Sequence, residues 1–294
     1  MLFWLGLFAV PGHLPPDWEF GATAMAAALG LIIAGLLSST FHLGHPERAW
    51  RTLSQWRSSW LSREAIAALV TFIPAIGFGL GWVVFSSTSG LWALTAVLGA
   101  VGAILTVICT AYIYRSLKPI PQWHNHWVVP NFLTLAAMSG ALLLNAIAAA
   151  LHNPMSQARI VVLPMIALAL VVKLGYWRFI DRLLPTSTPE TATGLGFLGR
   201  VRALEAPHTS ENFLLKEMGF RVARRHAKAL RRLAILCCYG LPLALSCLAF
   251  AIPGEIAWIA IGAAAGVALS GIFVERWLFF AEAKHATMLY YESR

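Results

Sequence analysis

The chain has 294 residues, of which 59% are apolar and 12% charged, and its formal net charge is +9. This composition excludes a soluble globular protein of that size, because too few polar side chains are present to cover its surface. Nucleic-acid binding is also not the simplest explanation of the positive charge. No nucleic-acid motif is present, and a basic excess in so apolar a chain is typical of cytoplasmic loops of a membrane protein.

Apolar stretches recur along the chain with short breaks between most of them. A helix of about 20 residues is long enough to cross the hydrocarbon core of a bilayer. Seven spans of this length are predicted, at about 20 to 42, 64 to 85, 91 to 114, 127 to 151, 159 to 182, 233 to 252 and 256 to 280. We therefore predict an all-α polytopic transmembrane helix bundle, with residues 1–294 forming a single integral membrane domain.

The N-terminal run MLFWLGLFAV is an eighth apolar stretch, but it has only 10 residues before Pro11. It is too short to cross, and it lacks the basic flank of a signal peptide. We hypothesise that translation starts upstream and that Met1 lies inside the first helix. The bundle would then have eight helices, the first of them truncated in this sequence. Mass spectrometry of the native N-terminus tests this hypothesis, which a protein beginning at Met1 would contradict.

Lys and Arg are distributed unevenly between the two sets of loops. The loop after the first full span, the loop at Arg115 and Lys118, segment 183 to 232 and the C-terminus share the basic side. The loops on the other side contain neither residue, and they are 11 to 19, 86 to 90, 152 to 158 and 253 to 255. Because short cytoplasmic loops collect Lys and Arg, we predict a multi-pass protein of the bacterial cytoplasmic (inner) membrane, with basic loops and C-terminus in the cytoplasm.

Segment 183 to 232 is the only sizeable piece predicted to lie outside the membrane. It opens with the linker-like PTSTPETATG and closes with KEMGFRVARRHAKALRRL, which predicts a basic helix at 216 to 232. Such a helix can bind anionic lipid headgroups or dock an iron–sulfur partner, and the sequence favours neither. The residues predicted to dock a partner are Lys216, Arg221, Arg224 and Arg225.

The stretch SSTFHLGHPERAWRTLSQWRSSWLSREA, residues 38 to 65, carries the most chemistry. Its middle predicts an interfacial helix with Pro46 in the first position, covering a cavity at the membrane surface. His42 ends one span and Glu64 begins the next, preceded by Ser62 as a candidate N-cap. Quinone turnover moves two electrons and two protons, and a histidine and a partly buried carboxylate can supply the protons. Arg48 is a candidate to stabilise negative charge on the ring.

Simpler interpretations of these and other charged residues remain open. A His at a helix C-terminus and a Glu in a first turn both complement the helix dipole without any further role. Lys173 and Arg178 lie toward the cytoplasmic half of a span, where snorkelling explains them. Glu275 and Arg276 are adjacent near a helix end, and we interpret them as interface anchors, with lining of the site as the less favoured alternative.

Two stretches resemble a known family. HLGxPxRA followed by LSREA, with His42 and Glu64 22 residues apart, is similar to the signature of the membrane-anchor subunits of dimethyl sulfoxide reductase. The resemblance implies that this His and Glu act in quinol binding and the linked proton chemistry. PQWHNHWVVPNFLT, residues 121 to 134, resembles the family at a cytoplasmic-side helix start. It implies that Trp127 and Asn131 lie near the same surface, as a possible quinone pocket.

RALEAPHTSENFLLKEMGFRVARRHAKALRRL and GIFVERWLFFAEAKHATMLYY resemble the branch that serves quinone-dependent sulfite dehydrogenase. The likeness covers nearly the whole chain except its N-terminus. It implies two partners, a molybdopterin catalytic subunit and an iron–sulfur electron-transfer subunit, that oxidise sulfite to sulfate and deliver electrons to ubiquinone or menaquinone at this chain. The chain itself would not act on sulfite.

No metal site is predicted. The four Cys residues show no CxxC or CxxCH spacing, so no iron–sulfur cluster or c-type haem is expected in this chain. All nine His residues lie at span ends or in loops, which argues against a b-type haem. Two alternatives remain, a quinol-oxidising anchor of a dimethyl sulfoxide or related reductase and, less favoured, a transporter, which would place polar groups at mid-membrane.

Overall fold

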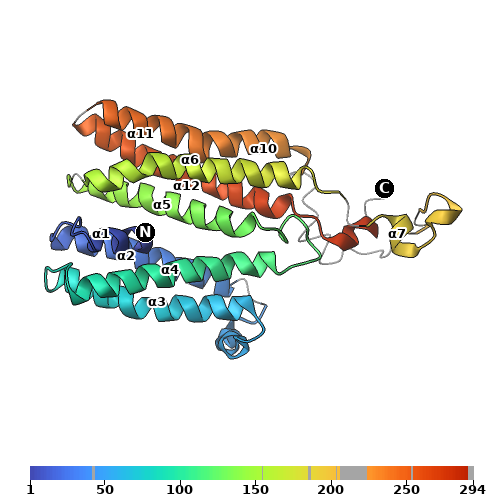
Figure 1. Cartoon of the computed structure of the whole chain (residues 1–294), viewed down its shortest axis with the longest axis horizontal. Coiled ribbons are helices and arrows are strands. Elements are labelled where there is room, and N and C mark those ends of the chain that lie inside the picture. Colours follow the sequence, from blue (N-terminus) through green and yellow to red (C-terminus); the bar gives the residue numbers. More distant parts are fainter. Residues whose placement is uncertain are drawn as a thin grey trace.

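The computed structural model describes residues 1–41, 44–153, 155–184, 187–202, 204–205, 224–252 and 254–290. Its regular structure in this part of the chain is helical throughout (Figure 1). The long helices are α2 (Trp18–Phe41), α3 (Trp60–Val83), α4 (Leu91–Arg115), α5 (Val128–Ala150), α6 (Ser156–Ile180) and α12 (Glu255–Ala281). One further long helix is built from α10 (Ala227–Ala234), η3 (Ile235–Gly240) and α11 (Leu241–Ala251). The short elements are α1 (Leu2–Ala9), η1 (Pro46–Gln55), α7 (Pro189–Thr193), η2 (Gly196–Leu198) and η4 (Ala286–Tyr290).

Seven helices in the described part of the chain are long and apolar enough to cross a membrane. They coincide with the seven predicted spans, so a multi-pass membrane bundle is confirmed. The largest shift is in the sixth span, which begins at Ala227 and not at 233. The basic residues at its start are therefore helical and continuous with the span, because Lys and Arg favour helices as much as most apolar residues do.

The eighth predicted helix is present as a short segment. Residues 2–9 do form a helix, but α1 has only 8 residues and is not among the seven helices long enough to cross. It is nevertheless buried, with Leu5 at 1% exposure, and packs against α4 and α5. The indole of Trp4 donates a hydrogen bond of 2.7 Å to the carbonyl of Ala137 in α5. The apolar N-terminal run is thus a part of the bundle interior.

The long helices lie roughly side by side, with α1 to α4 in one half and α5, α6, α11 and α12 in the other (Figure 1). Within the first half α3 packs mainly on α4, and within the second α5 packs on α6 and α12. Contacts of α4 and α1 with α5 join the halves. The end of α6, the start of α5 and the end of α12 lie at the same end of the bundle, where α7 projects beyond the helices (Figure 1).

The long helix that consists of α10, η3 and α11 contains one π-helical segment, η3. The amide of Leu241 bonds to the carbonyl of Leu236, five residues back, and Pro242 follows, which has no amide hydrogen to donate. The widened turn packs directly on α12 at Gly271, where a Cβ would lie 2.3 Å from the backbone nitrogen of Cys238. Only glycine allows the two backbones to approach this closely.

Candidate functional site

Two polar sites lie inside the bundle, one in each half. The first, called the Glu64 site, consists of Glu64 in α3 and Thr110 in α4. The second, called the Lys173 cluster, consists of Lys173 in α6 and of Glu275 and Arg276 in α12. Ionisable groups within spans are costly and are functional candidates by default. Of the two, only the Glu64 site was predicted from the sequence as a primary site.

Glu64 lies in the second turn of α3, near the end of the bundle that carries the basic loops. The hydroxyl of Thr110 donates a hydrogen bond of 2.6 Å to its Oε1 atom, and the carboxylate is partly buried. No Lys or Arg in the described part of the chain forms an ion pair with it. A carboxylate held by one neutral donor and no cation is free to gain and lose a proton.

The loop before α3 is fastened to the helix by polar contacts. The hydroxyl of Ser62, a fully buried residue, donates to the carbonyl of Thr52, and the Nε atom of Arg63 donates to the carbonyl of Trp56 at 2.8 Å. The N-cap of α3 is Ser59, whose hydroxyl accepts from the amide of Ser62 at 3.4 Å. The prediction that Ser62 is the cap was wrong, because the helix begins earlier, at Trp60.

The interfacial helix was predicted correctly in position. Element η1 begins at Pro46, and Trp50 and Trp56 are exposed at 66% and 53%, as an apolar face lying on a membrane surface would be. It is a 3₁₀ helix beside the start of α3. None of its residues lines the cavity described next, so it does not form the predicted cover. Arg48 is exposed and lies 3.8 Å from Glu47, and no described contact joins it to Glu64. His42 lies outside the described residues.

An apolar cavity of about 500 Å³ lies among α1 to α5. Ala68 and Thr71 line it from α3, and these residues follow Glu64 by about one and two helical turns on the same face. Thr106 lines it from α4, one turn before Thr110. Glu64 and Thr110 are not among the lining residues, and the Glu64 site therefore lies about one helical turn beyond the cavity, on the side of the basic loops. The remaining lining comes mainly from apolar residues of α1, α2 and α5.

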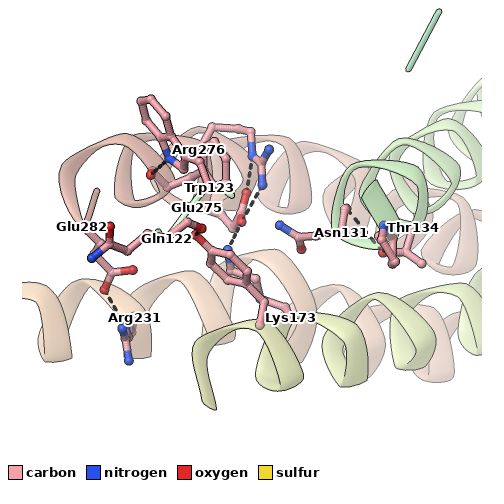
Figure 2. Close-up of polar contacts among 12 residues, drawn as sticks. Gln122, Trp123, Asn131, Thr134, Lys173, Arg231, Glu275, Arg276 and Glu282 are labelled. Atoms are coloured by element: carbon pink, nitrogen blue, oxygen red, sulfur yellow. Dashed lines mark hydrogen bonds and ion pairs between the residues drawn. The ribbon is translucent and has the colours of Figure 1, made fainter. Parts of the chain in front are cut away.

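The Lys173 cluster is more deeply enclosed. Lys173 and Glu275 are 0% exposed, and the Nζ atom forms an ion pair with Oε1 of Glu275. The guanidinium of Arg276 donates to both oxygens of the same carboxylate, at 2.5 and 2.8 Å, and lies 4.5 Å from the ring centre of Phe132. Nζ of Lys173 also lies 4.5 Å from the ring centre of Tyr176. Two cations thus hold one carboxylate among aromatic rings (Figure 2).

The snorkelling interpretation of Lys173 and the interface interpretation of Glu275 were wrong. Lys173 lies seven residues before the end of α6, and Glu275 six before the end of α12. Both helices run in the same direction, so each residue lies about 10 Å below its helix end at matched depth. Opposite charges at matched depth in two parallel spans are the signal that could have predicted this pair.

Trp127 and Asn131 belong to the second site. Trp127 is the N-cap of α5, and its ring covers Gly175 of α6, where a Cβ would lie 2.4 Å from Cη2 of the indole. Asn131 is 1% exposed, and its amide nitrogen has no hydrogen-bond acceptor in the described residues. Its side chain points toward the Lys173 cluster (Figure 2). The structure thus brings neither residue into contact with Glu64, and the two predicted parts of one pocket lie in different halves.

Aromatic side chains fill the space between the two sites. The ring of Tyr114 in α4 lies 5.3 Å from that of Phe279 and 5.6 Å from that of Phe132. Tyr114 is within electrostatic range of both Glu64 and Arg276. No hydrogen bond or ion pair in the described residues connects the sites. They are neighbours that share an apolar wall.

The predicted docking residues are only partly described. Lys216 and Arg221 lie outside the described residues. Arg224 donates to the carbonyls of Ala281 and Ala283 at 3.0 and 2.9 Å, so it caps the C-terminal end of α12. Arg225 is exposed and is the one described member of the set whose guanidinium faces solvent.

Comparisons with known proteins agree with this architecture. Residues 17–178 match the model of the family described as DMSO reductase anchor subunit (DmsC). The C subunit of the sulfite dehydrogenase of Allochromatium vinosum is 35% identical over 98% of this chain and 91% of its own length. The C chain of the anaerobic dimethyl sulfoxide reductase of Escherichia coli is 30% identical over 47% of this protein and 49% of its own length. No solved structure gives a significant match.

Proposed function

The chain belongs to the DMSO reductase anchor subunit family, and from that premise we propose that it binds quinone and passes electrons between an iron–sulfur partner and the quinone pool. The single observation that carries the proposal is the Glu64 site. There a partly buried carboxylate, bonded only to a hydroxyl among the described residues, lies about one helical turn beyond an apolar cavity.

Proton exchange is the task that the Glu64 site suits. Reduction of a quinone consumes two electrons and two protons, so a site for it needs a group that loads and releases protons. Glu64 lies in the second turn of α3, next to the basic loops, and can exchange protons with water at that end. The Thr110 hydroxyl orients the carboxylate without neutralising it.

The cavity suits an apolar ring or an aliphatic tail. A volume of about 500 Å³ and a lining that is mostly aliphatic match the ordinary dimensions of a small-molecule pocket. Thr71, Thr106 and Ser139 contribute hydroxyl groups to its wall. By likeness to the family, we also assign His42 and Arg48 to ligand binding. Trp127 and Asn131 lie beside the Lys173 cluster in the other half and are not assigned to this cavity. Ubiquinone and menaquinone both fit this chemistry.

The electrons need partners. No group of three or more His, Cys, Asp or Glu side chains in the described residues is placed to hold a metal ion, so we assign the electron carriers to other subunits. We propose an iron–sulfur subunit and a molybdopterin catalytic subunit, with sulfite as electron donor and the assembly in the bacterial cytoplasmic membrane. The full-length likeness to a sulfite dehydrogenase subunit favours sulfite over sulfoxide reduction, because the reductase relative matches only about half of this protein.

The test is sulfite-driven quinone reduction in membranes that contain the complete complex. Glu64→Gln keeps the shape and the hydrogen bond from Thr110 but cannot exchange a proton, so we expect turnover to fall about 100-fold. Glu19→Gln is the matched control, because Glu19 is exposed in the first turn of α2, and it should retain turnover. Full turnover of Glu64→Gln in an assembled complex would contradict the role of Glu64. If the wild-type complex has no sulfite-driven activity, the anchor of a quinol-oxidising reductase becomes the favoured function.

A further inference from the structure

A second cavity lies on the outer surface of the bundle, beside the Lys173 cluster, because its lining includes Trp177, whose ring centre lies 4.8 Å from Nζ of Lys173. It is a groove of about 500 Å³ between the end of α6 and the start of the α10–η3–α11 helix. We call it the Arg178 groove. Its lining residues are Leu174, Gly175, Trp177, Arg178, Asp181, Arg231, Arg232 and Ile235.

The charges in the groove are unbalanced. Arg231 donates to both oxygens of Asp181, at 2.7 and 2.9 Å, and to Glu282 at 2.6 Å. Burial raises the pKa of the Glu282 carboxyl, and the hydrogen bond from Arg231 opposes that rise, so Arg231 is occupied in keeping a buried carboxyl ionised. Arg178 and Arg232 are exposed and have no carboxylate partner in the described part of the chain. The groove therefore has two guanidinium groups available for an anion.

The depth of the groove points to the membrane interface. Arg178 lies two residues before the end of α6, and Arg232 lies near the start of the neighbouring span. Residues at the ends of spans lie at the level of the lipid headgroups. A phosphodiester at that level can be bound by two guanidinium groups, whose planar donor geometry matches phosphate oxygens.

The groove continues into an apolar strip. Below Arg178 on α6, Leu174 and Val171 are exposed at 44% and 64%, and below Arg232 on η3, Leu236 is exposed at 52%. Cationic groups at the mouth with exposed aliphatic side chains beneath them match the two parts of a phospholipid. The docking face of a soluble iron–sulfur subunit would lie beyond the ends of the spans. Such a partner would not contact an apolar strip within the bilayer.

We propose that the Arg178 groove is a specific binding site for an anionic phospholipid, with Arg178 and Arg232 on the phosphate and the acyl chains along α6 and η3. Basic pockets between transmembrane helices at a membrane surface are a recurring form of lipid recognition. This proposal is independent of quinone binding and of the direction of electron flow.

The test uses the full-length protein, purified with the subunits that copurify and exchanged into phosphatidylcholine nanodiscs that contain phosphatidylglycerol or cardiolipin. Native mass spectrometry counts the anionic lipids retained after release into detergent. We expect the double variant Arg178→Gln/Arg232→Gln to retain about tenfold less anionic lipid than the wild type. The matched control is Arg51→Gln/Arg57→Gln, which removes two exposed arginines in and beside η1 and should retain lipid as the wild type does.

Two further readouts separate the alternatives. Inorganic phosphate added in excess should leave the lipid bound, because the acyl chains contribute to binding, and displacement by phosphate would overturn the proposal in favour of a free-anion site. Iron in the purified complex reports the partner subunit. Loss of iron with unchanged lipid in the Arg178→Gln/Arg232→Gln variant would overturn the proposal in favour of a docking surface, and equal lipid retention by all variants would overturn it outright.

Discussion

Glu64 and Glu275 are both glutamates inside membrane-spanning helices, and the bundle treats them in opposite ways. Glu275 is 0% exposed and touches two cations, Lys173 and Arg276. Glu64 is partly buried beside a cavity and touches one hydroxyl. The difference teaches that burial alone does not identify a proton-exchanging carboxylate. A carboxylate between two cations is locked in its charged form and cross-links helices, whereas one bonded to a neutral donor stays able to titrate.

The packing around the two glutamates also differs, with close contacts near Glu275 and a cavity near Glu64. In the second half, α12 meets η3 at Gly271 and α6 meets Trp127 at Gly175, and both contacts leave no spare volume. Near Glu64, the cavity of about 500 Å³ lies among α1 to α5. The proposed quinone site is therefore next to space that side chains leave unfilled.

The sharpest test of this comparison exchanges each carboxylate for its amide. Glu275→Gln leaves Lys173 and Arg276 without a counter-ion, and we expect it to lower the free energy of unfolding by about 3–5 kcal/mol. Glu64→Gln should change it by less than about 1 kcal/mol, since no cation depends on it. Thermal unfolding of the purified complexes in detergent measures both.

A second change checks the cause. Adding Lys173→Met to Glu275→Gln removes the orphaned buried cation, so part of the lost stability should return. Equal melting temperatures for Glu275→Gln and Glu64→Gln would show that the Lys173 cluster is not a structural cross-link.

The next largest effect concerns packing in the second half. Gly271→Ala places a Cβ 2.3 Å from a backbone atom of η3. Because the backbone of η3 cannot move aside easily, we expect the free energy of unfolding to fall by about 1–3 kcal/mol. Gly266→Ala on the same helix has nothing within 4 Å of the new Cβ and should be neutral or stabilise by up to about 1 kcal/mol through helix propensity. Chemical unfolding of the two variants gives the comparison. A neutral Gly271→Ala would mean that α12 and η3 are not in fixed contact.

The smallest effect is expected at Thr110. Thr110→Val removes the only side-chain donor to Glu64 in the described residues. We expect it to lower the free energy of unfolding by about 1 kcal/mol. Quinone reduction should fall several-fold, less than in Glu64→Gln, because the carboxylate is still present but no longer oriented. Thr106→Val, one turn away, serves as the control for the loss of a hydroxyl in the cavity wall. If the Thr106 variant loses as much activity as the Thr110 variant, orientation of Glu64 is not the reason.

Some residues of these sites could be predicted from the sequence and others could not, for a physical reason. Glu64 was found because it lies beside a family-like motif at a helix start. Lys173 and Glu275 were interpreted one at a time as surface groups, since each, taken alone, lies within reach of a span end. Their burial depends on α6 and α12 packing together, which no local pattern encodes. Asn131 was assigned to the pocket of Glu64, yet its side chain points toward the Lys173 cluster (Figure 2).

The amino-acid sequence by itself determined the seven membrane spans, the separation of loops rich in Lys and Arg from loops that lack them, the short helix beginning at Pro46 and the family. These properties depend on hydropathy, charge and motif spacing within about 20 residues, which are local quantities. Only the tertiary structure decided that Glu275 joins Lys173, that Trp127 covers α6, and that a cavity adjoins Glu64. Those facts depend on which helices are neighbours and at what depth, and in a bundle of uniformly apolar helices this is settled by side-chain packing.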